Sequence, residues 1–342
     1  MPEGHSVHRI ARQFALHIVG KSVTATSPQG RFADGASDIS GHVMTDAKAV
    51  GKQLFLEFDN GLWLRVHLGL YGAWDFAGDI TADATTASAG GRMGQTNMRG
   101  TVTDADADAA ASAPTSSAAG ANGENEDSLH SIGAPRRARL RMAEQEKLGE
   151  ELETFPPEPV GAVRVRLLTE DTVADLRGPT ACEVLQPEEV QRVLDKLGPD
   201  PLVEDPAVGS ARFVERVLTK PTAIGLLLMD QNVIAGIGNV YRAELLFRAR
   251  LNPHTPGKRV PREVLENLWK DWTYLLDIGV RTGQMMTMDD LSEEGYRAAL
   301  ASRDDRHWVY HRTGQPCRVC GTPIVMEMAA GRKLYYCPVD QK

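Results

Sequence analysis

Residues 230–246 read DQNVIAGIGNVYRAELL and directly follow the apolar run AIGLLLM at 223–229. The apolar run predicts a helix, Gly236 and Gly238 permit a tight turn, and Asn239 begins a second helix that we expect it to cap. Free N–H groups at that helix start, together with the Asn239 side chain, could hold a phosphate. An ordinary helix–turn–helix corner explains the same residues equally well, so the stretch indicates a local fold and leaves its use open.

The chain around this stretch has a β-rich half and a helical half. Apolar residues at helical spacing predict helices at 3–18, 210–218, 238–248, 262–282 and 293–300. Alternating runs predict antiparallel strands at 54–58, 62–68 and 73–76. Asn60-Gly61 is typical of the turn of a hairpin, and strand character returns from Val160. We therefore expect an α+β protein.

A segment of different composition interrupts the β-rich half. Between Gly78 and Pro135 the chain is rich in Ala, Thr, Ser, Gly and Asp and has almost no large apolar residue. Such a stretch buries too little surface to offset its conformational entropy, so we predict a disordered insert. It holds eight acidic and two basic residues, and without it the 46 acidic and 38 basic residues of the chain become 38 and 36. The net charge of −8 therefore says little about the folded surface.

Composition places the chain among ordinary globular proteins. It has 342 residues, of which 42% are hydrophobic and 25% are charged. No apolar run is long enough to cross a bilayer, and the first residues, MPEGHS, open no secretory signal. We therefore expect a cytoplasmic protein.

Three of the four cysteines lie near the C-terminus, in the pattern Cys317-x2-Cys320 followed by Cys337-x2-Asp340. Paired residues at this spacing are typical of a tetrahedral zinc site. An aspartate stands where a fourth cysteine is expected, and His311 is a substitute ligand. A metal-free hairpin is the alternative.

The first residues, Met1-Pro2-Glu3, pair an amine with a carboxylate. Removal of Met1 would expose Pro2 as a secondary amine, which can attack an aldehyde-level carbon and form a cationic iminium that draws electrons. The Glu3 carboxylate could move the protons of that attack. Proline and glutamate also suit the first turn of any helix, and alone these residues favour that structural role.

Seven motifs, in this order, resemble the Fpg/Nei family of bifunctional DNA glycosylases, and particularly its endonuclease VIII branch. They are PEG at 2–4, GK at 51–52, HLGLYG at 67–72, LGPDPL at 197–202, DQNVIAGIGNVYRAELL at 230–246, YHRTGQPCRVCG at 310–321 and GRKLYYCP at 331–338. Each motif alone is weak, but together they cover nearly the whole chain outside the insert.

The resemblance implies four catalytic residues. Pro2 would attack C1′ of the damaged nucleotide's sugar and expel the base, and Glu3 would be its acid/base partner. Lys52 would contact a phosphate near the lesion and assist elimination; a solvated lysine at a strand start is the alternative. Arg332 would hold phosphates from the zinc finger and support δ-elimination.

The resemblance also implies DNA-binding residues. Asn239 matches the asparagine that grips the DNA backbone, and Lys196 stands where the branch has an arginine. Leu70 and Tyr71 align with the side chains that fill the space left by a flipped nucleotide; packing in the hairpin core is the alternative. The branch has a glutamine where this chain has Gly69, so we expect that contact to be missing. Basic residues should line the DNA site, with Arg9, Lys52, Lys196, Lys220, Arg242, Arg332 and Lys333 as the candidates.

From the resemblance we expect an N-terminal helix with a two-sheet β-sandwich, then a helical helix–two-turns–helix domain, then a zinc-finger β-hairpin. The domain boundaries that we predict are 2–195, with the insert at about 78–135, followed by 196–302 and 303–342. A structural Zn²⁺ would be held by Cys317, Cys320, Cys337 and Asp340.

The function that the resemblance implies is base excision repair. The enzyme would remove oxidised bases, above all oxidised pyrimidines, through a Schiff base on Pro2, and then cleave the abasic site by β,δ-elimination. A formamidopyrimidine-type purine glycosylase is the alternative within the class, and a non-catalytic protein that binds damaged or single-stranded DNA is the alternative outside it. We expect a bacterial, nucleoid-associated monomer that binds damaged double-stranded DNA, with single-stranded DNA as a second option and no membrane.

Overall fold

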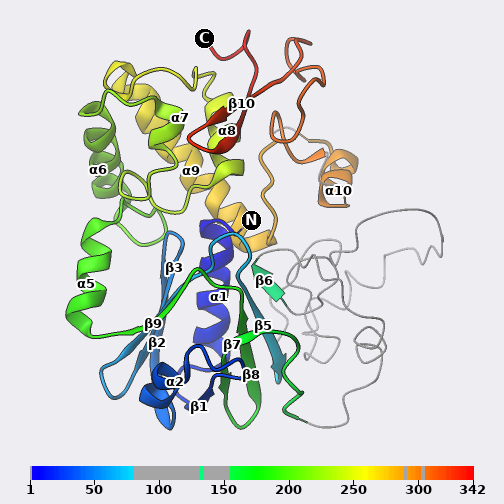
Figure 1. Cartoon of the computed structure of the whole chain (residues 1–342). Helices are drawn as coiled ribbons and strands as arrows, with labels where there is room; N and C mark the ends of the chain where they lie inside the picture. Colours follow the sequence, from blue (N-terminus) through cyan, green and yellow to red (C-terminus); the bar gives the residue numbers. More distant parts are fainter. Residues whose placement is uncertain (1, 81–130, 134–154, 289–290, 302–304) are drawn as a thin grey trace, which may run out of the picture. The chain divides into compact units, whose positions relative to one another are not determined.

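The computed structural model describes residues 2–80, 131–133, 155–288, 291–301 and 305–342, which fall into two compact units. The first unit contains residues 9–48 and the described part of 54–186. The second unit contains residues 2–8, 49–53 and the described part of 187–342. Residues 2–8 and the turn at 49–53 therefore belong to the same unit as the C-terminal half. Figure 1 shows the elements of the chain with their labels.

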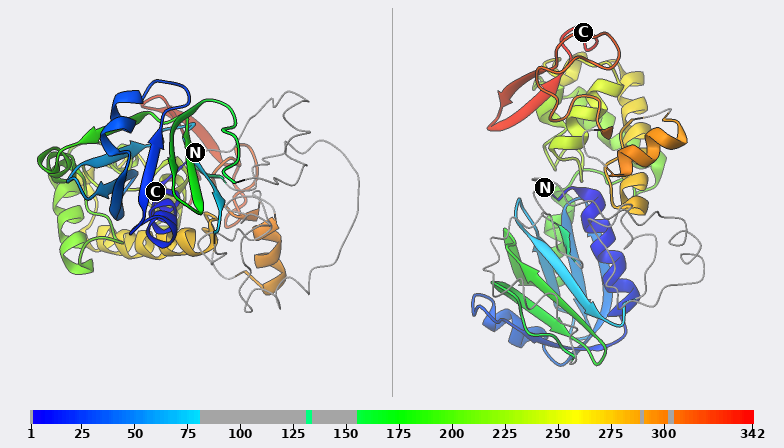
Figure 2. Two further views of the ribbon diagram at one scale, coloured as in Figure 1. Left: turned by 90° about the horizontal axis from the view of Figure 1, so that it is seen from below. Right: turned by 90° about the vertical axis from the view of Figure 1, so that its right-hand side faces the viewer.

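The strands of the first unit form an antiparallel β-sandwich (Figure 2). In chain order they are β1 (Ser22–Thr26), β2 (His42–Val50), β3 (Gln53–Phe58), β4 (Trp63–His67), β5 (Ala73–Gly78), β6 (Ser131–Gly133), β7 (Val163–Leu168), β8 (Thr172–Arg177) and β9 (Ala181–Leu185). Their hydrogen-bonded order is β6-β5-β8-β7-β1-β2-β3-β4-β9. Strand β1 links the two halves of this order, because its first residues pair with β2 and its last three pair with β7.

Two helices accompany these strands, α1 (Gly4–His17) and α2 (Ala33–Ile39). The apolar face predicted for residues 3–18 is buried, and Phe14 packs edge-on against Trp74 and Phe76 of β5, with ring centroids 4.9 and 5.2 Å apart. Aromatic pairs favour this arrangement. The predicted N-terminal helix is therefore confirmed, and it supplies part of the sandwich core.

Most of the predicted insert, at 81–130 and 134–135, lies outside the described residues. At its two edges the prediction of disorder is wrong. Gly78 is the last residue of β5, and residues 131–133 form β6, which pairs antiparallel with β5. Ile80 and Ile132 are buried at these two edges, because they are apolar side chains that gain from leaving water.

Helices dominate the second unit. They are α5 (Pro187–Lys196), α6 (Pro206–Leu218), α7 (Ile224–Leu227), α8 (Asn239–Arg248), α9 (Arg262–Thr282) and α10 (Glu293–Ala301), with a 3₁₀ turn at Gly257–Arg259. Their core gathers apolar residues of α6 to α9 around Trp269 and Trp272. A hairpin of β10 (Val325–Ala329) and β11 (Arg332–Tyr336) follows. The expected α+β fold, with its sandwich, helical part and C-terminal hairpin, is confirmed. None of the helices that the structure describes is long and apolar enough to span a membrane.

Candidate functional site

The carboxylate of Glu3 caps helix α8 within the second unit. Its Oε2 accepts hydrogen bonds from the backbone N–H groups of Gly238 (2.8 Å) and Tyr241 (3.4 Å), and its Oε1 accepts from Val240 (2.9 Å). Glu3 is fully buried, and a Cβ on Gly238 would lie 2.4 Å from its carboxyl carbon. The negative charge therefore sits at the positive end of the α8 dipole, and only glycine leaves room for it.

This geometry corrects two expectations. Asn239 does not cap α8: the capping position is Gly238, which has no side chain, and Asn239 is the first helical residue. Three of the N–H groups that could hold a phosphate, those of Gly238, Val240 and Tyr241, instead donate to Glu3. The sequence places Glu3 beside its own helix α1, and nothing local to it indicates a partner more than 230 residues away.

Asn239 points instead toward the C-terminal hairpin. Its Nδ2 donates to the backbone carbonyl of Lys333 on β11 at 2.8 Å, and its Oδ1 accepts from the guanidinium of Arg242. The same guanidinium donates to the Lys333 carbonyl at 3.0 Å. The predicted DNA-contacting asparagine is therefore tied to the strand that begins at Arg332.

Lys52 lies in the turn between β2 and β3, and a buried aspartate holds this turn. The N–H of Gly51 donates to Oδ2 of Asp200 at 2.6 Å, and the same oxygen lies 2.8 Å from Nε2 of His8 on α1. Gly51 has a φ of +59°, and a Cβ there would meet the Cβ of Ala235 at 2.7 Å. Asp200 belongs to the motif LGPDPL, but the sequence alone gave it no role.

Lys52 is partly buried, and this burial disfavours the charged form of its side chain. Burial lowers the pKa of Lys52 to about 8; the negative charge of Glu3 opposes this shift, and the positive charge of Arg332 adds to it. Lys52, Glu3 and Arg332 all belong to the second unit. Pro2, the residue before Glu3, is buried in the same unit.

The other predicted DNA-binding residues differ in their exposure. Lys196 is the exposed last residue of α5. Leu70 and Tyr71 lie in the loop between β4 and β5 of the first unit, with 46% and 81% of their surface exposed, so packing in a hairpin core is wrong for both. Arg9 and Arg242 are fully buried and cannot line an open surface, whereas Arg332 and Lys333 are exposed.

The structure also explains why position 69 is a glycine and not a glutamine. Gly69 has a φ of +66°, and a Cβ at this position would lie 1.8 Å from Oγ1 of Thr180. A glutamine side chain therefore does not fit this loop, because both the backbone conformation and the neighbouring strand end exclude it.

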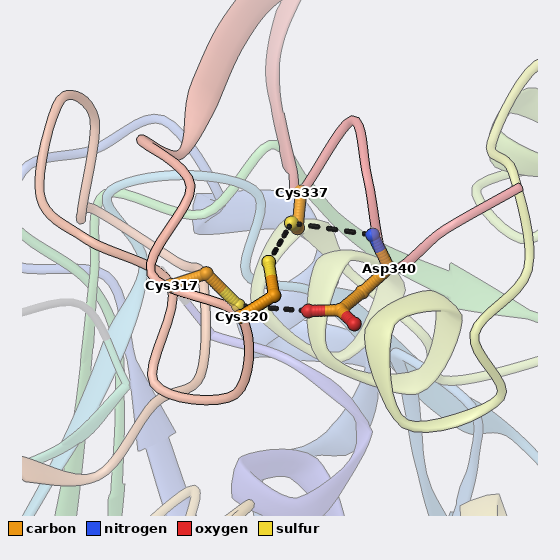
Figure 3. A group of neighbouring side chains, drawn as sticks. All are labelled: Cys317, Cys320, Cys337 and Asp340. Carbon is orange, nitrogen blue, oxygen red and sulfur yellow. Dashed lines mark hydrogen bonds between the residues drawn. The ribbon is translucent and has the colours of Figure 1, made fainter.

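The C-terminal cysteines form one cluster with Asp340 (Figure 3). The ligand atoms of Cys317, Cys320, Cys337 and Asp340 all lie within 4.8 Å of one another. Cys317 donates to Oδ2 of Asp340 at 3.0 Å, and the sulfurs of Cys320 and Cys337 are 3.5 Å apart. Three thiols and a carboxylate at this spacing fit a tetrahedral Zn²⁺. His311 is not a member of the cluster, and its ring stacks on Tyr310 with centroids 4.4 Å apart.

The cluster is anchored to α8 by a buried carboxylate that the sequence analysis missed. Glu244 accepts hydrogen bonds from the N–H groups of Trp308, Val309 and Tyr310 at 2.7 to 2.9 Å, and from Oγ1 of Thr287 at 2.5 Å. It is fully buried. Helix α8 therefore binds the Glu3 carboxylate at its first turn. Through Glu244 it also binds residues 308–310, which precede the cysteine cluster in the chain.

Comparison with known proteins agrees with these features. Three family models match the chain: the formamidopyrimidine-DNA glycosylase N-terminal domain at residues 1–108, the formamidopyrimidine-DNA glycosylase H2TH domain at 197–290, and the zinc finger found in FPG and IleRS at 314–342.

Two relatives and one solved structure are informative. The chain is 35% identical over 341 residues to Endonuclease 8 1 of Mycobacterium tuberculosis, covering all of both chains. It is 34% identical over 170 residues to the formamidopyrimidine-DNA glycosylase of Geobacillus kaustophilus, covering 49% of this chain and 60% of that one. The fold matches that of Lactococcus lactis Fpg in complex with DNA containing N7-benzyl-Fapy-dG, with a TM-score of 0.65, 17% identity and full coverage of both chains.

The fold and the full-length similarity together define a DNA-repair glycosylase. The chain belongs to the Fpg/Nei family of bifunctional DNA glycosylases, whose members combine base removal with abasic-site lyase activity. The predicted family and enzyme class are therefore confirmed, together with the zinc-finger domain.

Proposed function

We propose that the enzyme excises oxidised bases, with oxidised pyrimidines preferred, through a Schiff base on Pro2. The observation that carries the proposal is the start of α8, which holds the Glu3 carboxylate and, through Asn239, the backbone carbonyl of Lys333 next to Arg332. Pro2 and Lys52 belong to the same compact unit. An amine beside a fixed carboxylate, with cations nearby for phosphates, is the set that imine chemistry on DNA requires.

In the proposed reaction the Pro2 nitrogen forms a bond to C1′ and the bond from C1′ to the base breaks, so the base leaves with a proton. The sugar ring opens with a proton from Glu3, and a cationic iminium joins C1′ to Pro2. The iminium acidifies C2′, and loss of that proton expels the 3′ phosphate. A second elimination expels the 5′ phosphate, and hydrolysis releases Pro2. Lys52 and Arg332 would hold the departing phosphates.

The preference for pyrimidines is supported by two observations. The relative that matches the full length is named an endonuclease 8, whereas the glycosylase relative named for formamidopyrimidine matches about half of the chain. The exposed pair of Leu70 and Tyr71 provides an aliphatic and an aromatic side chain for the gap in a duplex from which a nucleotide has been flipped. We propose damaged duplex DNA as the main partner, single-stranded DNA as a second one, and a monomer at the nucleoid as the working form.

A structural Zn²⁺ completes the proposal. Three thiolates and the Asp340 carboxylate would hold it, and it would fix the β10–β11 hairpin that carries Arg332. The metal would take no part in the elimination.

The substrate is tested with 30-mer duplexes that each contain one lesion. We expect strand cleavage at oxidised pyrimidines to be at least tenfold faster than at 8-oxoguanine, with phosphate at both ends of the gap. Faster cleavage at the oxidised purine would instead indicate the formamidopyrimidine-type activity. Binding without cleavage of any lesion or abasic site would indicate the non-catalytic alternative.

A further inference from the structure

Arg242 on α8 is a fully buried cation whose hydrogen bonds go to neutral acceptors only. It donates to the side chain of Asn239, to the carbonyl of Lys333 at 3.0 Å and to the carbonyl of Gly225 at 3.3 Å. Its Nε meets no acceptor, and within the described part of the chain no carboxylate forms an ion pair with it. Arg248, six residues later on the same helix, instead pairs with both oxygens of Asp271 at 2.6 and 2.7 Å.

Burying an unpaired charge costs free energy, and the charged groups around Arg242 change that cost. Burial, followed by the positive charge of Arg332, lowers the pKa of Arg242 to about 10. Glu3 is the first carboxylate that influences Arg242, but its oxygens already accept three backbone N–H groups of α8. Arg242 therefore places a buried positive charge beside Asn239 that forms no ion pair within the described part of the chain.

Arg242 also decides which way the amide of Asn239 points. Because the guanidinium can only donate, the atom that faces it must be the amide oxygen, and Nδ2 must face Lys333. Nδ2 has two N–H groups, and one of them serves the Lys333 carbonyl at 2.8 Å. The other meets no acceptor among the described residues, so a donor is left over on Asn239.

We propose that Arg242 is a positioning residue for DNA binding: it fixes Asn239 with an N–H directed to a DNA phosphate, holds α8 to β11, and has that phosphate as its missing counter-charge. The proposal rests on the proposed role of Asn239 and Arg332 in binding the DNA backbone. A phosphate there would balance the charge of Arg242 without touching it.

The test is binding of a duplex that carries a stable abasic-site analogue, measured at several salt concentrations. Arg242→Met keeps most of the side-chain length and removes the charge; Arg242→Lys keeps the charge and removes the planar fork. We expect Arg242→Met to bind about 10- to 100-fold more weakly and to lower the slope of log Kd against log salt by about 1. Arg242→Lys should keep the wild-type slope and still lose affinity, because lysine cannot hold both Asn239 and the Lys333 carbonyl.

Three further variants test whether Arg242 acts on DNA binding through Asn239. If Arg242 acts through Asn239, the affinity of the double variant Arg242→Lys with Asn239→Ala should equal that of Asn239→Ala alone. Arg248→Met is the control, because Arg248 lies on the same helix but pairs with Asp271. This variant should leave the slope of log Kd against log salt unchanged. Urea unfolding shows whether each variant is folded. If Arg242→Met does not fold, the comparison of Arg242→Lys, Asn239→Ala and their double variant tests the proposal.

The proposal is overturned if Asn239→Ala weakens binding while a folded Arg242→Met binds with wild-type affinity and salt slope. It is also overturned if the effects of Arg242→Lys and Asn239→Ala simply add. If Asn239→Ala itself has wild-type affinity, the assignment of Asn239 to the DNA backbone in the proposed function fails instead.

Discussion

Glu3 has to satisfy two demands with one carboxylate. It is proposed to move protons for Pro2, and it also accepts three N–H groups at the first turn of α8. These hydrogen bonds fix its position before any substrate arrives, so the chemical group requires no reorganisation. They also mean that a substitution at Glu3 changes stability as well as chemistry.

Glu3→Gln should therefore lower the free energy of unfolding. The amide places an NH₂ group against backbone donors and removes the charge from the α8 dipole, at a cost of about 1–2 kcal/mol. Urea unfolding measures the change. Glu215→Gln is the matched control, since Glu215 forms an exposed ion pair with Arg262 and its loss should cost less than about 0.5 kcal/mol. A Glu3→Gln variant as stable as the wild type would contradict the capping role.

Lys52 gives a prediction about pH. Its pKa of about 8 means that the ammonium is present below pH 8 and is lost as the pH rises through that value. If the ammonium holds a phosphate, DNA binding by the wild type should weaken between pH 7 and 9, by up to about tenfold per pH unit above 8. Lys52→Arg stays charged and should bind equally well across this range.

Glu3→Gln provides a second test of the predicted pH dependence. The charge of Glu3 raises the pKa of Lys52, so its removal should move the midpoint of the binding profile to lower pH. Fluorescence anisotropy with an abasic-site duplex, at constant ionic strength, measures both profiles. Parallel profiles for the wild type and Lys52→Arg would show that Lys52 does not bind the phosphate as a cation.

The loop between β4 and β5 is the element that presents Tyr71. With 81% of its surface exposed, the side chain contributes little to the fold, so Tyr71→Ala should leave the unfolding free energy within about 0.5 kcal/mol of the wild type. Loss of base stacking should weaken binding to an abasic-site duplex by about 5- to 100-fold, since each stacked base is worth about 1–3 kcal/mol. Tyr274→Ala, at a 53% exposed tyrosine on α9, is the control and should have no effect on binding. Equal affinities for the two variants would exclude stacking by Tyr71.

Elements with regular patterns could be predicted from the sequence, and others could not. Helix α9 matches its predicted range at 262–282, because its apolar residues repeat along one face and Gly283, with a φ of +68°, ends it. Strand β8 was missed. There Asp175 pairs with Arg166 of β7 in a buried ion pair, at the position where an alternating pattern would place an apolar residue. Only the register of the two strands shows that each charge has a partner.

The candidate site was predicted in part for the same reason. The motifs identified Glu3, Lys52 and Asn239, but not which groups hold them. The cap from Glu3 to α8 and the contact from Gly51 to Asp200 join residues about 235 and 149 positions apart. No local sequence pattern encodes such pairs, because they exist only once the second unit has folded.

At the scale of the whole molecule, the second unit connects the N-terminus to the cysteine cluster through α8. Glu3 binds the first turn of α8, Arg242 binds β11, and Glu244 binds the chain that leads to Cys317. Cys317 and Cys337 also pack with Phe247 of α8 in a small apolar cluster. A change at the metal site should therefore affect the hairpin that carries Arg332.

Zinc removal tests this connection. We expect the purified enzyme to contain about one Zn²⁺ per chain, and a chelator to lower both its melting temperature and its δ-elimination. Asp340→Ala should lose metal, whereas Asp340→Cys should hold it more tightly against the chelator because thiolate is the preferred ligand. Elemental analysis and thermal unfolding give these quantities. Wild-type stability in an enzyme shown to be free of zinc would contradict the structural role.

The central claim, that Pro2 is the nucleophile, is tested most directly by borohydride reduction on an oligonucleotide with one abasic site, followed by mass mapping of the adduct. The wild type should give a covalent adduct on the peptide that begins with Pro2. An enzyme with one extra residue before Pro2, whose nitrogen is then an amide, should bind the DNA and give none. An adduct that maps to Lys52, or one that survives in the extended enzyme, would contradict the account.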